Sequence, residues 1–404
     1  MADFKMTGSR GEVVIADRVL IESEPEPVSH YCHVVRAGDM VWVSGTTARG
    51  GDGKARAAGP TEQARVALQG MGTALAAVGS GPADVVRVSN WLTRIDDRAA
   101  VNIAREEFFG ATLPASILCE VPRLVDPDLL YEIDAVAVVG GEKERVTLPG
   151  SEPFSHYCDV VRSGDLVWVS GCGALGPGHE LLAPGDATEQ ARIALGNLRL
   201  ALAAVGARIE DVVKVTNLLT NMDDRARVNI ARREFFGETL PASIIAEVPR
   251  LVVDGMLYEV DAVAVIGGSK QRVTLPGSQP ISHYCDVVRA GDLVWVTGQA
   301  AAESTPDGSG YTILAEGDAE GQARIAHEHL GQALAAVGAT PADVVKVTNY
   351  VTNIDDRSRV NIARKAFFGD TRPASVLVQV PKLVLPGLMY EVEAMAVVGA
   401  GRQS

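Results

Sequence analysis

One pattern of apolar and polar positions occurs three times along the chain. Each copy ends in two apolar runs, at 113–124 and 131–138, at 240–251 and 258–265, and at 372–383 and 390–397. Apolar runs of this length, bounded by Pro and Gly, are typical of buried strands. The histidines that head matching segments, His30, His156 and His283, lie 126 and 127 residues apart, so each copy is long enough to form its own core. The sequence therefore predicts three domains, at residues 1–141, 142–268 and 269–404.

The first copy gives the order of elements that we expect in all three. Apolar residues recur at steps of three or four between Pro60 and Gly79, which predicts an amphipathic helix. Runs rich in β-branched residues predict strands before and after this helix. The full expectation for copy one is β-β-β-α-β-α-β-β, with strands at 19–22, 31–35, 40–44 and 85–93, helices at 60–79 and 96–110, and the two final strands.

Two helices on one face of such a sheet leave its other face without a cover. Three sheets that pack these faces together would bury them, and the short polar joints at 140–145 and 267–272 suit closely packed domains. The prediction is an α+β protein, a monomer with internal pseudo-threefold symmetry. Copy three carries five extra residues, and their turn chemistry at 303–310 predicts a surface loop.

Composition narrows the classes of function. Of the 404 residues, 47% are hydrophobic and 22% are charged, as in a well-packed globular protein. The net charge of −14 argues against a nucleic-acid partner. Because we find no signal-peptide pattern and no run of about 18 apolar residues, we expect a cytoplasmic protein without membrane contact. Five cysteines without a C-x-x-C pair indicate reduced thiols.

Carboxylates within the last apolar run are the leading candidates for chemistry. A glutamate that is partly desolvated at a domain junction would have a raised pKa and could transfer protons. The alternative is an ion pair that ties one domain to the next. Asp134, Asp261 and Glu393 follow two residues later on the same strand face, and for them we favour the ion pair. The candidate acid/base residues are Glu132, Glu259 and Glu391.

The segment Ser-His-Tyr-Cys begins at residues 29, 155 and 282. If it is a strand, alternation sends Tyr31, Tyr157 and Tyr284 to one face and the His and Cys side chains to the other. A Cys–His nucleophile pair is therefore not favoured, and buried cysteines are the simpler interpretation. A metal site is disfavoured too, because His33 is replaced by aspartate in the other copies.

Asparagines within the second helix are further candidates. A mid-helix asparagine is mildly unfavourable, so its side chain is expected to bond a loop or a ligand, and the loop is the favoured alternative. These asparagines are Asn102, Asn229 and Asn361. The chain carries no motif of a nucleotide-binding loop or of a hydrolase elbow, and we expect no cofactor.

Taken together, these motifs resemble the Rid (YjgF) family of reactive-intermediate deaminases. The resemblance rests on Val-Thr-Gly-Gln-Ala, Val-Asn-Ile-Ala-Arg with Phe-Phe-Gly, Pro-Ala-Ser, Glu-Val-Pro-Arg-Leu and Tyr-Glu-Ile-Asp-Ala-Val-Ala-Val, and it covers nearly the whole chain three times. It implies chorismate-mutase-like domains that form a trimer within one polypeptide. It also implies a ligand cleft at each junction between domains.

The resemblance implies roles for two positions. Family deaminases use a glutamate of the last strand to handle water, and this sequence retains that glutamate in each copy. They hold the substrate carboxylate with an arginine directly after Pro-Ala, where this chain has Ser116, Ser243 and Ser375. A hydroxyl cannot supply the charge of a guanidinium, so hydrolysis of 2-imino acids is not expected.

The sequence thus favours a divergent enzyme that acts on a small imine, enamine or carbonyl metabolite. The expected reaction is addition or elimination of water, or cyclisation, and a role in specialised metabolism would suit it. Glu would be the acid/base, and Tyr, Ser and Asn would position the substrate. A non-catalytic small-molecule binder or regulatory protein is the alternative. A ribonuclease is disfavoured by the acidic charge.

Overall fold

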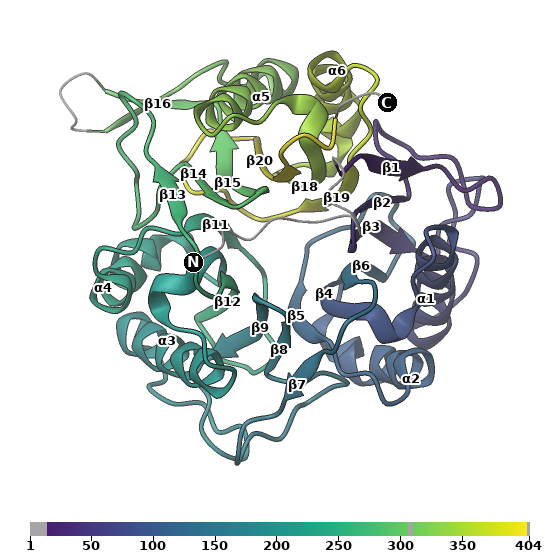
Figure 1. Ribbon diagram of the computed structural model, residues 1–404, viewed down its shortest axis with the longest axis horizontal. Coiled ribbons are helices and arrows are strands. Elements are labelled where there is room, and N and C mark those ends of the chain that lie inside the picture. Colours follow the sequence, from purple (N-terminus) through teal and green to yellow (C-terminus); the bar gives the residue numbers. More distant parts are fainter. Residues whose placement is uncertain (1–13, 306–309, 402–404) are drawn as a thin grey trace.

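The computed structural model describes residues 14–305 and 310–401, which form three similar units around a common centre (Figure 1). Each unit is a six-stranded sheet with two helices on its outer face, so the chain is an α+β protein. Repeat 1 has the strand order β1-β2-β3-β6-β4-β5, in which only β4 and β5 are parallel. Its elements are β1 Ala16–Val19, β2 Val34–Ala37, β3 Met40–Thr47, α1 Pro60–Ala77, β4 Val85–Leu92, α2 Arg98–Phe109, β5 Ala115–Glu120 and β6 Tyr131–Val138.

Repeats 2 and 3 follow the same order of elements, apart from the two-stranded hairpin β16–β17 in repeat 3, which confirms the predicted fold. Repeat 2 comprises β7 Glu144–Val146, β8 Val160–Ser163, β9 Leu166–Gly173, α3 Ala187–Ala204, β10 Val212–Leu219, α4 Arg225–Phe236, β11 Ala242–Glu247 and β12 Tyr258–Val265. Repeat 3 comprises β13 Lys270–Val273, β14 Val287–Ala290, β15 Leu293–Ala300, β16 Ala302–Ser304, β17 Tyr311–Ile313, α5 Ala319–Ala336, β18 Val344–Val351, α6 Arg357–Phe368, β19 Ala374–Gln379 and β20 Tyr390–Val397.

Local sequence explains the helix boundaries. Pro60 occupies the first turn of α1, where its missing N–H costs no hydrogen bond. Leu68, Met71 and Leu75 are buried against the sheet. The helix ends just before Gly79, whose φ of 70° favours glycine. The predicted helix is therefore confirmed to within two residues.

Three details differ from the sequence-based expectation. The first strand, expected at 19–22, is β1 at Ala16–Val19, because its position is set by pairing with β2, from Ala16 opposite Ala37 to Val19 opposite Val34. Residues 28–33 are not in a strand, because β2 begins only at Val34. The expected strand at 31–35 and the face assignment for Tyr31 that depended on it are therefore wrong. The inserted segment of repeat 3 is also not only a loop, because β16 and β17 pair as a short antiparallel hairpin. The tip of this segment lies outside the described residues.

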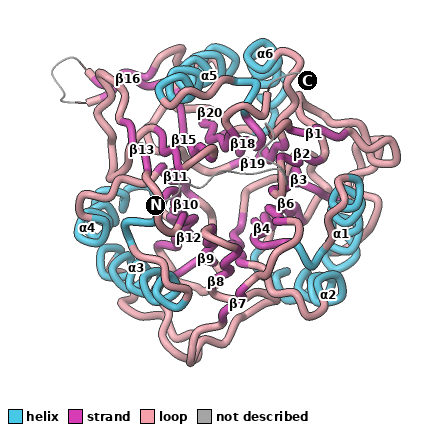
Figure 2. The backbone as a smooth tube through the Cα atoms, viewed as in Figure 1, coloured by secondary structure: helices cyan, strands magenta, loops and turns pink. Residues whose placement is uncertain are grey.

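The inner faces of the three sheets pack against one another, as predicted (Figure 2). Trp42, Trp168 and Trp295 are almost completely buried in a core to which all three repeats contribute. A second shared core contains Trp91, Leu218 and Tyr350. Among the described residues, each inner face is covered by the other two repeats, so the three units depend on one another for burial.

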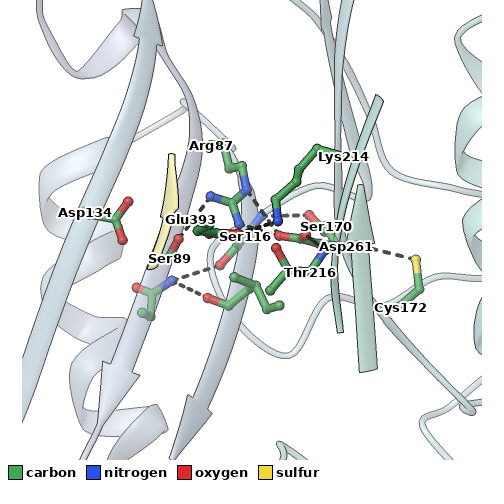
Figure 3. A network of polar contacts seen from close by, with 12 residues as sticks. Arg87, Ser89, Ser116, Asp134, Ser170, Cys172, Lys214, Thr216, Asp261 and Glu393 are labelled. Atoms are coloured by element: carbon green, nitrogen blue, oxygen red, sulfur yellow. Dashed lines mark hydrogen bonds and ion pairs between the residues drawn. The ribbon is translucent and has the colours of Figure 1, made fainter. Parts of the chain in front are cut away.

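Between these two cores, three ion pairs link the repeats in a ring. Figure 3 shows two of them, Arg87–Asp261 and Lys214–Glu393, together with Asp134 of the third. Each pair joins a basic residue of the strand between the two helices (β4, β10 or β18) to an acid of the last strand in the next repeat. The ion pairs predicted for the second acids are therefore confirmed. The pairs are Arg87–Asp261, Lys214–Glu393 and Lys346–Asp134.

No helix within residues 14–305 and 310–401 is both long and apolar enough to span a bilayer.

Candidate functional site

Polar side chains from neighbouring repeats meet at each of the three junctions. We name the junctions cleft 1/2, cleft 2/3 and cleft 3/1 after the repeats that form them. In each, the tyrosine and the glutamate come from one repeat and the serine from the repeat before it. The groups are Tyr157, Glu259 and Ser116 in cleft 1/2, Tyr284, Glu391 and Ser243 in cleft 2/3, and Tyr31, Glu132 and Ser375 in cleft 3/1.

A bulge in the sheet makes room for each glutamate. The pairing of β3 with β6 shifts register between Val43 and Thr46, and Glu132 lies opposite Thr47. The Glu132 carboxyl group lies over Gly45, where a Cβ atom would overlap its Oε1. Gly171 and Gly298 stand in the same relation to Glu259 and Glu391. Glycine at this point therefore lets the carboxyl group lie flat against the strand.

These carboxyl groups are buried and poorly hydrogen-bonded. Glu132 is 6% exposed, and Glu259 and Glu391 are each 4% exposed. Oε2 of Glu259 and Oε2 of Glu391 are buried without a hydrogen-bond partner among the described residues. Burial, together with the second acid of the same strand, raises the pKa of each glutamate to about 8. At neutral pH these groups are mainly protonated and can donate a proton.

The tyrosine and the serine contribute neutral polar groups. Burial raises the pKa of Tyr31 to about 12, so its phenol stays protonated. The Ser375 hydroxyl accepts hydrogen bonds from Asn349 Nδ2 at 3.1 Å and from Arg364 Nη2 at 2.9 Å. The same pattern recurs at Ser116 and Ser243. The serine is therefore held rigidly as an acceptor by groups behind it.

The sequence analysis missed the arginine that contacts each serine. It comes from the second helix of the repeat, and its guanidinium group also donates to the backbone carbonyl of a histidine in the next repeat. A signal was present, because Arg105 follows Val101 by four residues and so lies on the buried face of α2. The three arginines, Arg105, Arg232 and Arg364, are at most 1% exposed. A positive charge is therefore present next to the serine, although the strand carries no arginine.

The asparagines of the second helix connect neighbouring repeats and do not line the pockets of clefts 2/3 and 3/1. Asn102 Oδ1 accepts hydrogen bonds from the Ser155 hydroxyl at 2.8 Å and from the His156 backbone N–H at 2.7 Å. Asn361 makes the same pair of contacts, and Asn229 bonds the backbone N–H of His283. These bonds tie a helix to the first loop of the next repeat, which is the favoured alternative of the sequence analysis.

The His and Cys side chains of the same loop are occupied by separate backbone groups. His156 Nε2 lies 2.9 Å from the Thr112 carbonyl oxygen, and Cys158 Sγ donates to the Leu113 carbonyl at 3.1 Å. Burial raises the pKa of the Cys158 thiol to about 12. In this state the thiol is a poor nucleophile. The described part of the chain holds no group of three potential metal ligands.

The clefts differ in size and in lining. Cleft 2/3 has a volume of about 390 Å³, whereas cleft 3/1 holds two smaller pockets of about 60 Å³ each, which share Tyr31, Gly45 and Arg49. The larger cleft is bordered by the β16–β17 hairpin. Part of its polar lining differs from the other repeats, since the positions of Gln299 and His329 hold Thr46 and Gly70 in repeat 1 and Cys172 and Asn197 in repeat 2. Polar groups that converge on a cavity of this size are typical of a ligand site.

Comparison with known proteins agrees with this arrangement. A RutC family protein of Pyrococcus horikoshii is 34% identical over 113 residues, which are 28% of this chain and 89% of that protein. The mouse protein named 2-iminobutanoate/2-iminopropanoate deaminase is 36% identical over 118 residues, which are 28% of this chain and 82% of the mouse protein. A crystal structure of chorismatase matches 78% of this chain over 93% of the chorismatase chain, with a TM-score of 0.52 and 16% sequence identity. At this identity the match shows a shared fold alone.

A family model covers most of the chain. The model described as endoribonuclease L-PSP matches residues 21–139, 149–266 and 276–398, one segment in each repeat. The chain therefore belongs to the endoribonuclease L-PSP (YjgF/Rid) family and carries three copies of its domain.

Proposed function

We propose that the chain is an enzyme that adds water to a small imine, enamine or carbonyl compound in cleft 2/3, with Glu391 as the acid/base. The observation that carries this proposal is a protonated, poorly bonded carboxyl group on the wall of a cavity of about 390 Å³. The similarity to a mouse protein named as an imine deaminase supports the same reaction class. The cleft residues need no cofactor for it.

The proposed hydrolysis of an imine has four proton transfers, all of them to or from Glu391. Glu391 donates its proton to the imine nitrogen, which makes the carbon more electrophilic. The carboxylate that results accepts a proton from the attacking water as the C–O bond forms. Glu391, now protonated again, gives this proton to the nitrogen of the carbinolamine as the C–N bond breaks and the amine leaves. The hydroxyl group gives its proton to the Glu391 carboxylate as the C=O bond forms, which regenerates the protonated acid. A carboxyl pKa of about 8 suits both the donation and the acceptance of protons near neutral pH.

The other groups of the cleft position the substrate. Tyr284 and Ser243 line the same cavity as Glu391, together with the apolar side chains of Ile245 and Leu388. A rigidly held hydroxyl can fix one polar atom of a ligand. We assign these residues to binding and reserve proton transfer for the glutamate.

The test compares matched glutamates. Glu391→Gln removes the proton donor of cleft 2/3, and Glu259→Gln makes the same change in cleft 1/2. Imines formed from ammonia and simple aldehydes, ketones or 2-oxo acids serve as substrates, and the accelerated release of ammonia is measured. We expect Glu391→Gln to reduce turnover by about 10² to 10⁴-fold and Glu259→Gln to leave most of it.

Full activity of Glu391→Gln with every substrate that the wild-type protein turns over would overturn the proposal. A wild-type chain that binds these compounds without turnover would instead favour the non-catalytic binder.

A further inference from the structure

Clefts 2/3 and 3/1 differ in how their space is divided. Cleft 3/1 holds two pockets of about 60 Å³ each, one lined by Glu132 and the other by Gly70 of α1. In cleft 2/3 the matching residues, Glu391 and His329 of α5, line one cavity of about 390 Å³. We call the part around Glu391 the reactive compartment and the part around His329 the second compartment. The two compartments are joined in cleft 2/3.

Charge does not distinguish the two clefts in the same way. Arg225 and Arg232 occupy the positions in α4 that Arg357 and Arg364 occupy in α6. The difference between the clefts is therefore one of space and of hydrogen bonding.

An ion pair stands between the two pockets of cleft 3/1. Arg49 lines both pockets, and its Nε donates to Asp126 at 2.7 Å. The same positions of repeat 3 hold Ala302 and Leu385, which line the joined cavity and pack against the second shared core. A methyl group in place of a long guanidinium side chain leaves the passage between the compartments open.

The second compartment has a fixed wall. Loop 275–279 and the β16–β17 hairpin both border the cavity. The Tyr311 hydroxyl donates to the Gln279 carbonyl, and the Gln279 N–H donates to the Ser304 hydroxyl at 3.2 Å. These two bonds hold the hairpin against the loop without a ligand.

His329 offers a hydrogen-bond acceptor to the second compartment. Its Nδ1 lies 3.0 Å from the Ala300 carbonyl oxygen, which can only accept, so Nδ1 carries the proton. In the neutral imidazole Nε2 is then an acceptor, and no hydrogen bond among the described residues occupies it. Glu303 of the hairpin lines the same cavity, and its carboxylate also only accepts. A ligand group that donates hydrogen bonds would suit this compartment.

We propose that cleft 2/3 takes an elongated imine or carbonyl compound, with its reactive carbon at Glu391 and a distal hydroxyl or N–H group that donates to His329. An apolar body would fill the passage beside Ala302 and Leu385. The substrate class rests on the proposed function, because it takes Glu391 as the reacting group. A cavity of about 390 Å³ lies within the range of roughly 300–1,000 Å³ of small-molecule sites, and the pockets of cleft 3/1 are far smaller.

The test uses ligands that differ in length and in one donor group. Acetone, benzylacetone and the para-hydroxy derivative of benzylacetone are titrated into the full chain by calorimetry. The imines that they form with ammonia are used to measure kcat/KM. We expect the hydroxy derivative to bind about three to ten times more tightly than benzylacetone, because it adds one hydrogen bond, and acetone to bind most weakly.

His329→Asn removes the acceptor and keeps the helix bonded to the strand. Asn197 holds this position in repeat 2 and donates to the carbonyl of Gly173, the residue that matches Ala300. In this variant the two aryl ketones should bind within about twofold of each other. An undiminished preference for the hydroxy derivative would overturn the assignment of His329.

Ala302→Arg with Leu385→Asp rebuilds the ion pair of repeat 1 inside cleft 2/3. The preference for benzylacetone over acetone, in binding and in kcat/KM, should fall at least about tenfold, because the passage is blocked. Leu175→Arg with Val253→Asp makes the matched exchange in cleft 1/2 and should change this preference less than about twofold.

Equal effects of the two double variants would overturn the proposal, and so would a wild-type protein that does not prefer benzylacetone to acetone. Binding that follows the expected pattern without turnover of any imine would support the two compartments and overturn only the catalytic role of Glu391.

Discussion

Lys214 on β10 of repeat 2 forms an ion pair with Glu393 on β20 of repeat 3, and the two side chains are only 10% and 14% exposed. Arg87–Asp261 and Lys346–Asp134 form the equivalent ion pairs between the other repeats. In each pair the acid lies two residues after the candidate acid/base glutamate of the same strand. The ring therefore joins the three repeats and also supports the strand that carries each glutamate of the clefts. Its charges lie in a small cavity between two apolar cores, where water screens them little.

The ring makes a prediction about stability. Asp134→Asn leaves the ammonium of Lys346 buried without its counter-charge, because the two side chains are 3% and 8% exposed. We expect the free energy of unfolding to fall by about 3–5 kcal/mol. The measurement is the urea concentration at the midpoint of unfolding, compared between variant and wild-type protein that share the same dependence of unfolding free energy on urea concentration.

Two controls separate this effect from a general loss of charge. Lys346→Met with Asp134→Leu removes both charges and should come close to wild-type stability. Glu107→Gln breaks an exposed pair with Arg65 and should cost less than about 1 kcal/mol. An Asp134→Asn variant as stable as the Glu107→Gln variant would contradict the assignment.

The order of elements was predictable because helices and strands leave different periods in the sequence. The spacing of Leu68, Met71 and Leu75 depends only on local geometry, and so do the apolar final strands. The inward packing followed from the uncovered sheet faces. These expectations held because they needed no knowledge of how side chains from different repeats meet.

The arginine contacts could not be inferred in the same way. Arg105 Nη2 donates to Ser116 within its own repeat and to the His156 carbonyl of the next repeat, and Nη1 donates to Ser155 of the next repeat. Such contacts depend on the junction between repeats, which leaves no periodic signal. Tyr31 was misplaced for a related reason, since its loop is fixed by Asn361 of another repeat rather than by strand pairing.

A methyl group at the bulge should disable a cleft without disturbing the fold. In Gly298→Ala the new Cβ overlaps Glu391 Oε1 and Ile244 Cδ1, so the carboxyl group must move. We expect turnover to fall at least about tenfold, because small displacements of a catalytic group are costly. The measurement is the rate of imine hydrolysis at saturating substrate.

Two glycines provide the comparison. Gly171→Ala displaces Glu259 in cleft 1/2 and should leave turnover intact if cleft 2/3 is the working site. Gly51→Ala places its Cβ in open space and should change neither activity nor stability. Equal loss of turnover in Gly171→Ala and Gly298→Ala would show that cleft 2/3 has no special role.

The raised pKa values predict how stability depends on pH. A glutamate has an ordinary pKa of 4.5, and Glu391 has one of about 8 in the folded protein, because burial and Glu393 oppose its charge more than Lys214 favours it. The folded state therefore binds more protons than the unfolded state between these two pH values, and stability falls as pH rises through this window. The stabilising effect of the neutral carboxyl group is complete below pH 4.5 and is lost above about pH 8.

Replacing Glu132, Glu259 and Glu391 together by Gln should remove the part of the pH dependence of stability that these carboxyl groups cause. Glutamine stays neutral, so the triple variant should melt at a higher temperature than the wild-type protein at pH 9, and the two melting temperatures should converge toward pH 5. Thermal melts across pH 5–9 measure the difference. A wild-type protein that gains stability relative to the variant as pH rises would show that these glutamates are ionised in the folded state, and it would remove their role as proton donors.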